Sequence, residues 1–178
     1  YIPVLFLGLF DVDEGAFAST SLQMIKQKQY LVPTIGDELR LEKPILTYWV
    51  QVMSIYIFGP NEFALRLPSI IASFIWAYSF SSFVNQHTRN VRRSEIFLNL
   101  LTLPGVFIMS SAATADAFLN LFITLLMINL FNYSIKKDDK ILIWSGIYVA
   151  LGFLTKGLTI IAICLSLIHI SEPTRRLI

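Results

Sequence analysis

The sequence predicts an all-α membrane protein that crosses the bilayer several times. Hydrophobic residues make up 55% of the chain and charged residues only 15%, whereas a soluble domain carries about 25% charge. The mean hydropathy is +0.64, and apolar stretches close to the roughly 20 residues of a spanning helix recur along the chain. A net charge of +2 is too small to indicate nucleic-acid binding, and the lone cysteine, Cys164, excludes an internal disulfide.

The first elements are a short apolar run and a long polar segment. Residues 1–10 are apolar, and we interpret them as the end of a span. Residues 11–66 form a segment that should have structure of its own, because long unstructured loops are uncommon. Within it, the apolar spacing over residues 14–26 predicts a weak amphipathic helix. Pro33 and Gly36 then predict a turn.

The next apolar stretch, residues 45–58, is predicted to lie in the membrane interface. It is only about 14 residues long, below the roughly 17–25 residues of a spanning helix, and it contains Gln51. Its aromatic residues Tyr48, Trp49 and Tyr56 are typical of the headgroup region. A proline at its start suits the first turn of a helix.

Four further spans and the beginning of another complete the pattern. The third of the sequence's spans is short and interrupted by Pro104 and Gly105. The predicted spans are residues 67–84, 96–109, 117–133 and 141–154, and residues 158–164 begin one more.

The basic loops set the orientation. "QHTRNVRR" follows the second span and "IKKDDK" follows the fourth, and short basic loops face the cytoplasm. Asp13, Asp116 and Lys156 then all fall on the outer side. If residues 45–58 crossed the bilayer instead, Asp13 and Asp116 would lie on opposite sides.

The end of the chain has a different character. "LSLIHISEPTR", residues 165–175, resembles the in-frame translation of a sequencing adapter. We interpret residues 165–178 as an artefactual tail and exclude them from fold reasoning. The chain is then expected to be a fragment cut at both ends, with one partial transmembrane domain over residues 1–164.

Charged residues gather at the outer boundary, where several explanations are open. A charge at the bilayer centre costs about 2.5–3.5 kcal/mol on insertion scales, and the boundary avoids most of that cost. Asp13 and Glu14 could complement a helix dipole, Lys156 could extend to the interface, and Arg66 could mark the start of a span. A functional site that uses these groups together is the other reading. The sequence contains no P-loop and no G-x-G-x-x-G, C-x-x-C or H-E-x-x-H motif.

Five motifs in order, "DVDEGAFA", "EKPILTYW", "FGPNEFALRLPS", "TADAFLNLF" and "GFLTKG", resemble the signature series of membrane glycosyltransferases with the GT-C fold. The resemblance is strongest to the lipid A aminoarabinose transferases and the related protein O-mannosyltransferase-like proteins, and it covers nearly all of the chain before residue 165. It implies that this chain is the N-terminal part of a GT-C transmembrane domain, with interfacial helices in the first outer loop, residues 11–66.

The resemblance also implies roles for individual residues. Asp13 matches the principal catalytic aspartate, and Asp116 matches a second catalytic acid. Lys43 matches a lysine that holds the phosphate of the carrier lipid, and Lys156 matches one that faces the cavity. Glu42 matches an acid that binds a divalent metal in some members; no other cofactor is implied.

Two more residues, Glu14 and Arg66, are also expected to bind substrate. The chain departs from the family pattern in two places: "ATADAF" lacks a basic residue that often precedes Asp116, and "EKPIL" has one proline where two are common.

The implied function is transfer of a sugar from a polyprenyl-phosphate carrier to an acceptor, either a lipid A-like lipid, a glycan or a protein. The reaction would invert the anomeric carbon, and the site would face outward from a bacterial inner membrane. A transporter or flippase is the alternative, although transporter sites lie near the bilayer midplane and these charges lie at one face. A membrane scaffold, in which the acids only cap helices, is the third reading.

Overall fold

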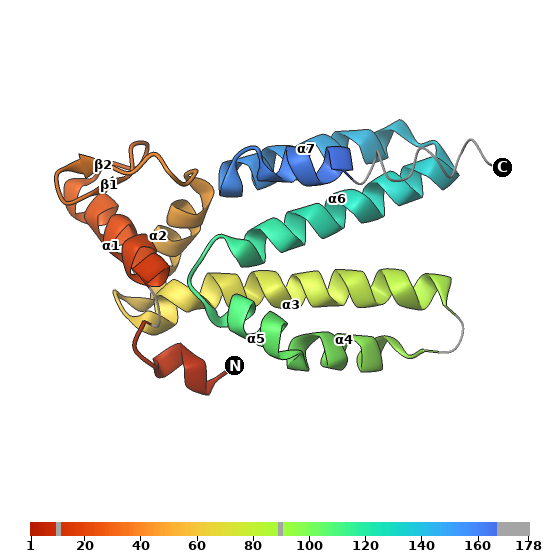
Figure 1. The fold of residues 1–178 in the computed structure, drawn as a ribbon, viewed down its shortest axis with the longest axis horizontal. Coiled ribbons are helices and arrows are strands. Elements are labelled where there is room, and N and C mark those ends of the chain that lie inside the picture. Colours follow the sequence, from red (N-terminus) through yellow and green to blue (C-terminus); the bar gives the residue numbers. More distant parts are fainter. Residues whose placement is uncertain (10–11, 89–90, 167–178) are drawn as a thin grey trace.

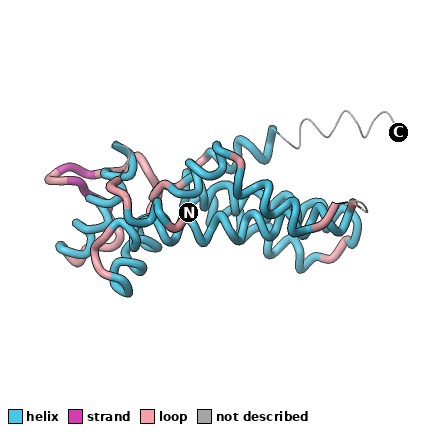
Figure 2. Tube along the Cα trace, turned by 90° about the horizontal axis from the view of Figure 1, so that it is seen from below, coloured by secondary structure: helices cyan, strands magenta, loops and turns pink. Residues whose placement is uncertain are grey.

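The structure is a computed structural model that describes residues 1–9, 12–88 and 91–166. It is an elongated bundle of helices with one small hairpin (Figure 1). Short elements from the first third of the chain gather at one end, and the long helices extend from there to the other end (Figures 1 and 2). The predicted all-α class is confirmed.

The short elements begin with a 3₁₀ helix, η1 (Pro3–Phe6), followed by α1 (Val12–Gln27). A two-stranded antiparallel hairpin of β1 (Thr34–Ile35) and β2 (Glu38–Leu39) turns at Gly36, whose φ of +61° suits glycine. The Gln23 side chain accepts a 2.9 Å hydrogen bond from the Gly36 amide and so ties the hairpin to α1. The helix α2 (Leu46–Phe58) follows.

The long part of the bundle contains α3 (Glu62–His87), α6 (Asp116–Lys136) and α7 (Asp139–Lys156). A bent pair, α4 (Arg93–Thr102) and α5 (Pro104–Ser111), packs along α3. Residues 159–166 are again helical.

Only some predicted spans meet the length and composition of a membrane helix. Among the described residues, α3 and α6 are long and apolar enough to cross a membrane, and the pair α4–α5, bent by 72°, would make a third span if it counts as one. Pro104 begins α5, so the interruption predicted at this proline is confirmed. α7 forms as predicted but carries charges at both ends, and its span stays a prediction.

Three boundaries differ from the sequence prediction. α3 begins at Glu62 rather than at residue 67, because the Asn61 side chain caps it by accepting from the Ala64 amide. Arg66, predicted to close the outer loop, therefore lies inside α3. Residues 1–9 do not form an α-helix. The predicted tail starts within the last helical segment at 165 and 166, and from residue 167 it lies outside the described residues.

The helix α2 packs on α1, α3 and α7. Its 13 residues span about 20 Å at 1.5 Å per residue, shorter than the roughly 30 Å hydrocarbon core. Gln51 is buried rather than exposed to lipid. The helix is confirmed, and its position in the interface stays a prediction.

Candidate functional site

A buried ion pair joins elements at the end of the bundle that holds α1 and the hairpin. Glu14 lies in the first turn of α1, Arg66 lies in the second turn of α3, and both side chains are almost completely buried. The Arg66 Nε donates to Glu14 Oε1 at 3.0 Å, and Nη2 donates to Oε2 at 2.8 Å. This two-pronged geometry is the strongest that an arginine and a carboxylate form.

The remaining N–H groups of Arg66 hold the first segment of the chain. Nη1 donates to the carbonyls of Val4 and Leu7, and Nη2 also donates to the carbonyl of Gly8 at 2.9 Å. All five guanidinium donors are therefore used inside the protein. Arg66 thus satisfies three carbonyls of a segment that is not α-helical.

A second bond from this ion pair fixes the loop before α6. Glu14 Oε1 accepts from the Ala113 amide at 2.5 Å, and the Ala113 carbonyl accepts from Gln51 Nε2 at 3.0 Å. Gln51 in turn accepts from Ser21 Oγ at 2.7 Å. Side chains from α1 and α2 thus satisfy both backbone groups of Ala113, three residues before Asp116. Sequence reasoning missed this role of Gln51, because a single glutamine in an apolar helix carries no local signal.

The structure pairs Glu14 with Arg66, although the sequence placed both among the substrate-binding residues. Since every donor of Arg66 is occupied, we assign the pair to holding four pieces of chain together next to Asp13. Glu14 also borders a cavity of about 350 Å³ between η1 and α5.

Asp116 and Lys156 meet directly. Lys156, the last residue of α7, forms a 2.5 Å ion pair with Asp116, the first residue of α6. Both side chains are about one-third exposed, at 35% and 34%. The pair therefore contacts solvent. A charge pair that only holds two helices together does not need to be accessible, so this exposure is consistent with a site.

Packing brings the other predicted residues to the same end. Ala115, next to Asp116, belongs to a core cluster with Phe17 of α1 and Tyr48 of α2. Asp13 lies one helical turn before Phe17, so both project from the same side of α1. Asp13 is exposed at the start of that helix.

The lysine of the second motif also lies at this end. Lys43 is half-buried. Pro44, the next residue, approaches Gly157, where an added Cβ would lie 3.9 Å from the Pro44 Cγ. Lys156 precedes that glycine. The convergence predicted for Asp13, Lys43, Asp116 and Lys156 is thus supported by the packing of their neighbours.

Glu42 is exposed, and the described residues do not supply it with companion metal ligands. No group of three or more His, Cys, Asp and Glu side chains that could hold a metal ion occurs among the residues the structure describes. The donor set of the described residues does not fit a metal by itself.

An arginine that sequence reasoning overlooked belongs to the same site. The Arg40 guanidinium lies over the Phe17 ring, 5.3 Å from its centroid, and the residue is only 7% exposed. The Phe17 and Tyr48 rings lie 5.2 Å apart. Burial raises the pKa of the Tyr48 phenol, the Arg40 guanidinium lowers it, and the Glu42 and Asp13 carboxylates raise it further. The available signal was the position of Arg40, three residues before Lys43.

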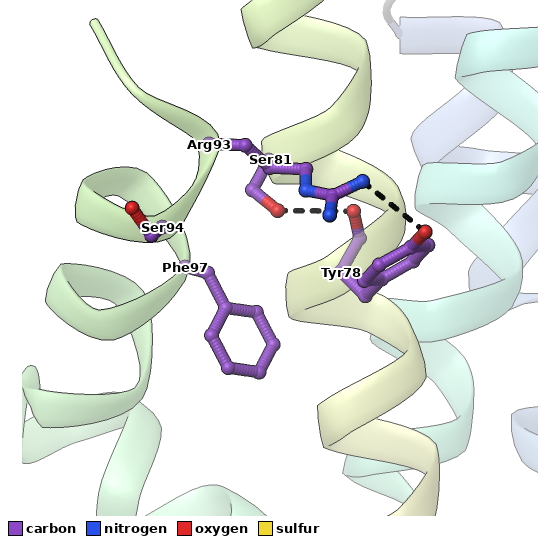
Figure 3. Close-up of a pocket in the computed structure, with 5 residues that line it drawn as sticks. All are labelled: Tyr78, Ser81, Arg93, Ser94 and Phe97. Atoms are coloured by element: carbon purple, nitrogen blue, oxygen red, sulfur yellow. Dashed lines mark hydrogen bonds between the residues drawn. The ribbon is translucent and has the colours of Figure 1, made fainter.

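A cavity of about 450 Å³ lies at the opposite end of the bundle, between α3 and α4. There Arg93 reaches over Tyr78 and donates to its hydroxyl at 3.2 Å (Figure 3). Neither residue was predicted to be functional. An exposed arginine beside a basic loop is expected on a cytoplasmic face.

Solved structures share this fold. ArnT from Cupriavidus metallidurans in the apo state superposes with a TM-score of 0.87 at 20% identity, over 98% of this chain and 34% of that chain. The same protein bound to undecaprenyl phosphate gives a TM-score of 0.84 at 22% identity. At these identities the likeness establishes the fold, and it confirms the GT-C architecture expected from the motifs.

Curated relatives are similar in sequence as well. An undecaprenyl phosphate-alpha-4-amino-4-deoxy-L-arabinose arabinosyl transferase of Wigglesworthia glossinidia brevipalpis is 30% identical over 88% of this chain. A protein of the same name in Photorhabdus laumondii subsp. laumondii is 29% identical over 87%. The chain spans 29% of the length of each.

A family model settles the classification. The model described as dolichyl-phosphate-mannose-protein mannosyltransferase matches residues 42–178, which include the Glu42–Lys43 motif, Asp116 and Lys156. The chain is therefore an integral membrane protein that belongs to the dolichyl-phosphate-mannose-protein mannosyltransferase family.

Proposed function

We propose that the protein to which this chain belongs is a glycosyltransferase that moves a sugar from a polyprenyl-phosphate carrier to an acceptor at the outer face of the membrane. The observation that carries the proposal is the Asp116–Lys156 ion pair, one-third exposed, at the end of the bundle where Asp13 and Lys43 also lie. The family and the relatives named for undecaprenyl phosphate favour this class over a transporter.

The location of the site suits a lipid-linked donor. A polyprenyl phosphate cannot leave the bilayer, so its sugar must be transferred at the membrane surface. The charged residues here lie at the ends of α6 and α7 and at the start of α1, not at the middle of the long helices. An interfacial site also avoids the cost of burying charge in hydrocarbon.

The proposed chemistry is a displacement at the anomeric carbon of the sugar. An acceptor oxygen forms a bond to that carbon from one face, and the bond to the phosphate oxygen breaks on the other face with inversion. Polyprenyl phosphate leaves with the bonding electron pair. Lys43, a compact cation, stabilises the charge that develops on the departing phosphate.

Asp13 acts on the acceptor in this proposal. If the acceptor is a hydroxyl, its proton passes to the Asp13 carboxylate during attack. If the acceptor is an ionised phosphate, as on a lipid A-like molecule, no proton has to move and Asp13 orients the acceptor. The Asp116–Lys156 ion pair contacts the sugar from one side and limits how it can lie. The sugar class, pentose or hexose, and the acceptor, lipid, glycan or protein, are open within this proposal.

The first prediction concerns Lys43. In a chain of the length of its relatives, Lys43→Ala should raise the KM for the polyprenyl-phosphate sugar about 10–100-fold, because a charge-assisted contact to phosphate worth roughly 1.5–3 kcal/mol is lost. The kcat should fall less. Steady-state transfer of radiolabelled sugar by purified protein measures both constants. Lys28→Ala, an exposed lysine at the end of α1, is the matched control. Unchanged KM in Lys43→Ala would remove Lys43 from the donor site.

The second prediction concerns orientation. In a Cys164→Ser background, a cysteine at Glu38 should react with an impermeant maleimide added to intact cells, and a cysteine at Arg92 should react only after permeabilisation. Both positions are exposed and lie at opposite ends of the bundle (Figure 1). The expected difference follows from the basic loops. Equal labelling of both positions in intact cells would refute the outward site.

A further inference from the structure

Arg40 is a buried arginine that forms no ion pair with the residues the structure describes. Its Nε is buried and has no hydrogen-bond partner among the described residues, and none of their carboxylates lies within ion-pair distance of it. Its backbone amide donates to the Pro33 carbonyl at 2.8 Å, which extends the hairpin and fixes where the side chain begins. A guanidinium cannot lose its proton to relieve burial. Keeping it unpaired is costly, which indicates an anionic partner.

The Tyr48 hydroxyl is also buried without a hydrogen-bond partner among the described residues. Tyr48 is fully buried, and its oxygen is another buried polar atom without a partner in the described part of the chain. A phenol carries its proton at neutral pH and can donate a hydrogen bond. Phe17 contacts both side chains. The Arg40 guanidinium lies over its ring, and the Tyr48 ring lies beside it.

The nearby acids do not form an ion pair with Arg40 in the described part of the chain. Asp13 and Glu42 act on Tyr48 electrostatically, yet neither forms an ion pair with Arg40 among the described contacts. Both carboxylates are exposed. This cluster therefore holds a buried planar cation, Arg40, and a buried hydroxyl donor, Tyr48, near two exposed acids.

Resting on the proposed function, we propose that Arg40, assisted by the Tyr48 hydroxyl, binds a phosphate oxygen of the polyprenyl-phosphate donor as a second cationic contact beside Lys43. The guanidinium fork matches the spacing of phosphate oxygens, whereas an ammonium offers only a point charge. Two cations also suit a leaving group whose negative charge increases as the sugar departs. Arg40 in this assignment touches the donor and orients its phosphate relative to Asp13.

Direct binding of undecaprenyl phosphate without a sugar tests the assignment. Arg40→Gln in the full-length protein should bind this lipid roughly 10–100-fold more weakly, as expected for loss of charge-assisted hydrogen bonds. Binding of uncharged undecaprenol should not change. Tyr48→Phe should weaken phosphate-lipid binding by a smaller factor, and Arg40→Lys should recover only part of the loss. Arg92→Gln, an exposed arginine at the other end, is the control for general charge effects.

The outcomes separate the possible roles. Equal loss of both lipids, or a large fall in melting temperature for both Arg40→Gln and Arg40→Lys, would assign Arg40 to folding and overturn the proposal. Undiminished binding of undecaprenyl phosphate by Arg40→Gln, with binding lost in Lys43→Ala, would overturn the Arg40 assignment alone. Failure of the wild-type protein to bind undecaprenyl phosphate would overturn the proposed function as well.

Discussion

Replacing Arg66 with methionine should destabilise the protein by about 3–5 kcal/mol, the usual cost of leaving a buried charge without its partner. Glu14 would stay buried without its arginine, while its Oε1 would still accept from the Ala113 amide. The carbonyls of Val4, Leu7 and Gly8 would also lose their donor. The expected result is a large fall in the detergent melting temperature and in the yield of folded protein.

A double variant separates charge from packing. Glu14→Gln removes the buried charge but keeps an oxygen that can accept from Ala113. Combined with Arg66→Met, it should therefore recover a substantial part of the lost stability. Arg92→Met breaks the exposed Arg92–Glu95 pair, whose side chains are 85% and 51% exposed, and should cost about 0–1 kcal/mol. If Arg66→Met melts like the wild type, the ion pair does not hold the outer end together.

Replacing Asp13 with asparagine should lower turnover roughly 10²–10⁴-fold, the range typical of a lost acid–base group. The change keeps the size of the side chain and removes its charge and basicity. Asp13 is exposed and forms no ion pair with the residues described, so the variant should fold normally. Transfer of labelled sugar from polyprenyl phosphate by purified full-length protein measures the effect.

Two controls test whether a loss of transfer in Asp13→Asn comes from the Asp13 carboxylate itself. Asp37→Asn changes an exposed carboxylate in the hairpin of the same outer segment and should transfer sugar at the wild-type rate. Melting curves of the Asp13 variant should match those of the wild type. Near wild-type transfer by Asp13→Asn would leave only the helix-dipole role, since the carboxylate lies in the first turn of α1.

The sequence by itself determined the helical membrane class, the order of the helices, the break at Pro104 and the family. These features depend on local composition and spacing, which are readable without knowledge of contacts. The motifs also identified Asp13, Lys43, Asp116 and Lys156 as a set, although nothing in the spacing of the chain states how distant segments meet.

Only the tertiary structure decided which charges stabilise the fold and which stay accessible. Glu14 and Asp13 are adjacent in the sequence, but successive helical residues point about 100° apart, so one is buried against Arg66 and the other is exposed. Gln51 gave no local signal, and Arg40 gave only its closeness to Lys43 in the sequence. The environment of both side chains is set by distant segments. Burial and pairing are properties of packed neighbours, and a linear pattern does not contain them.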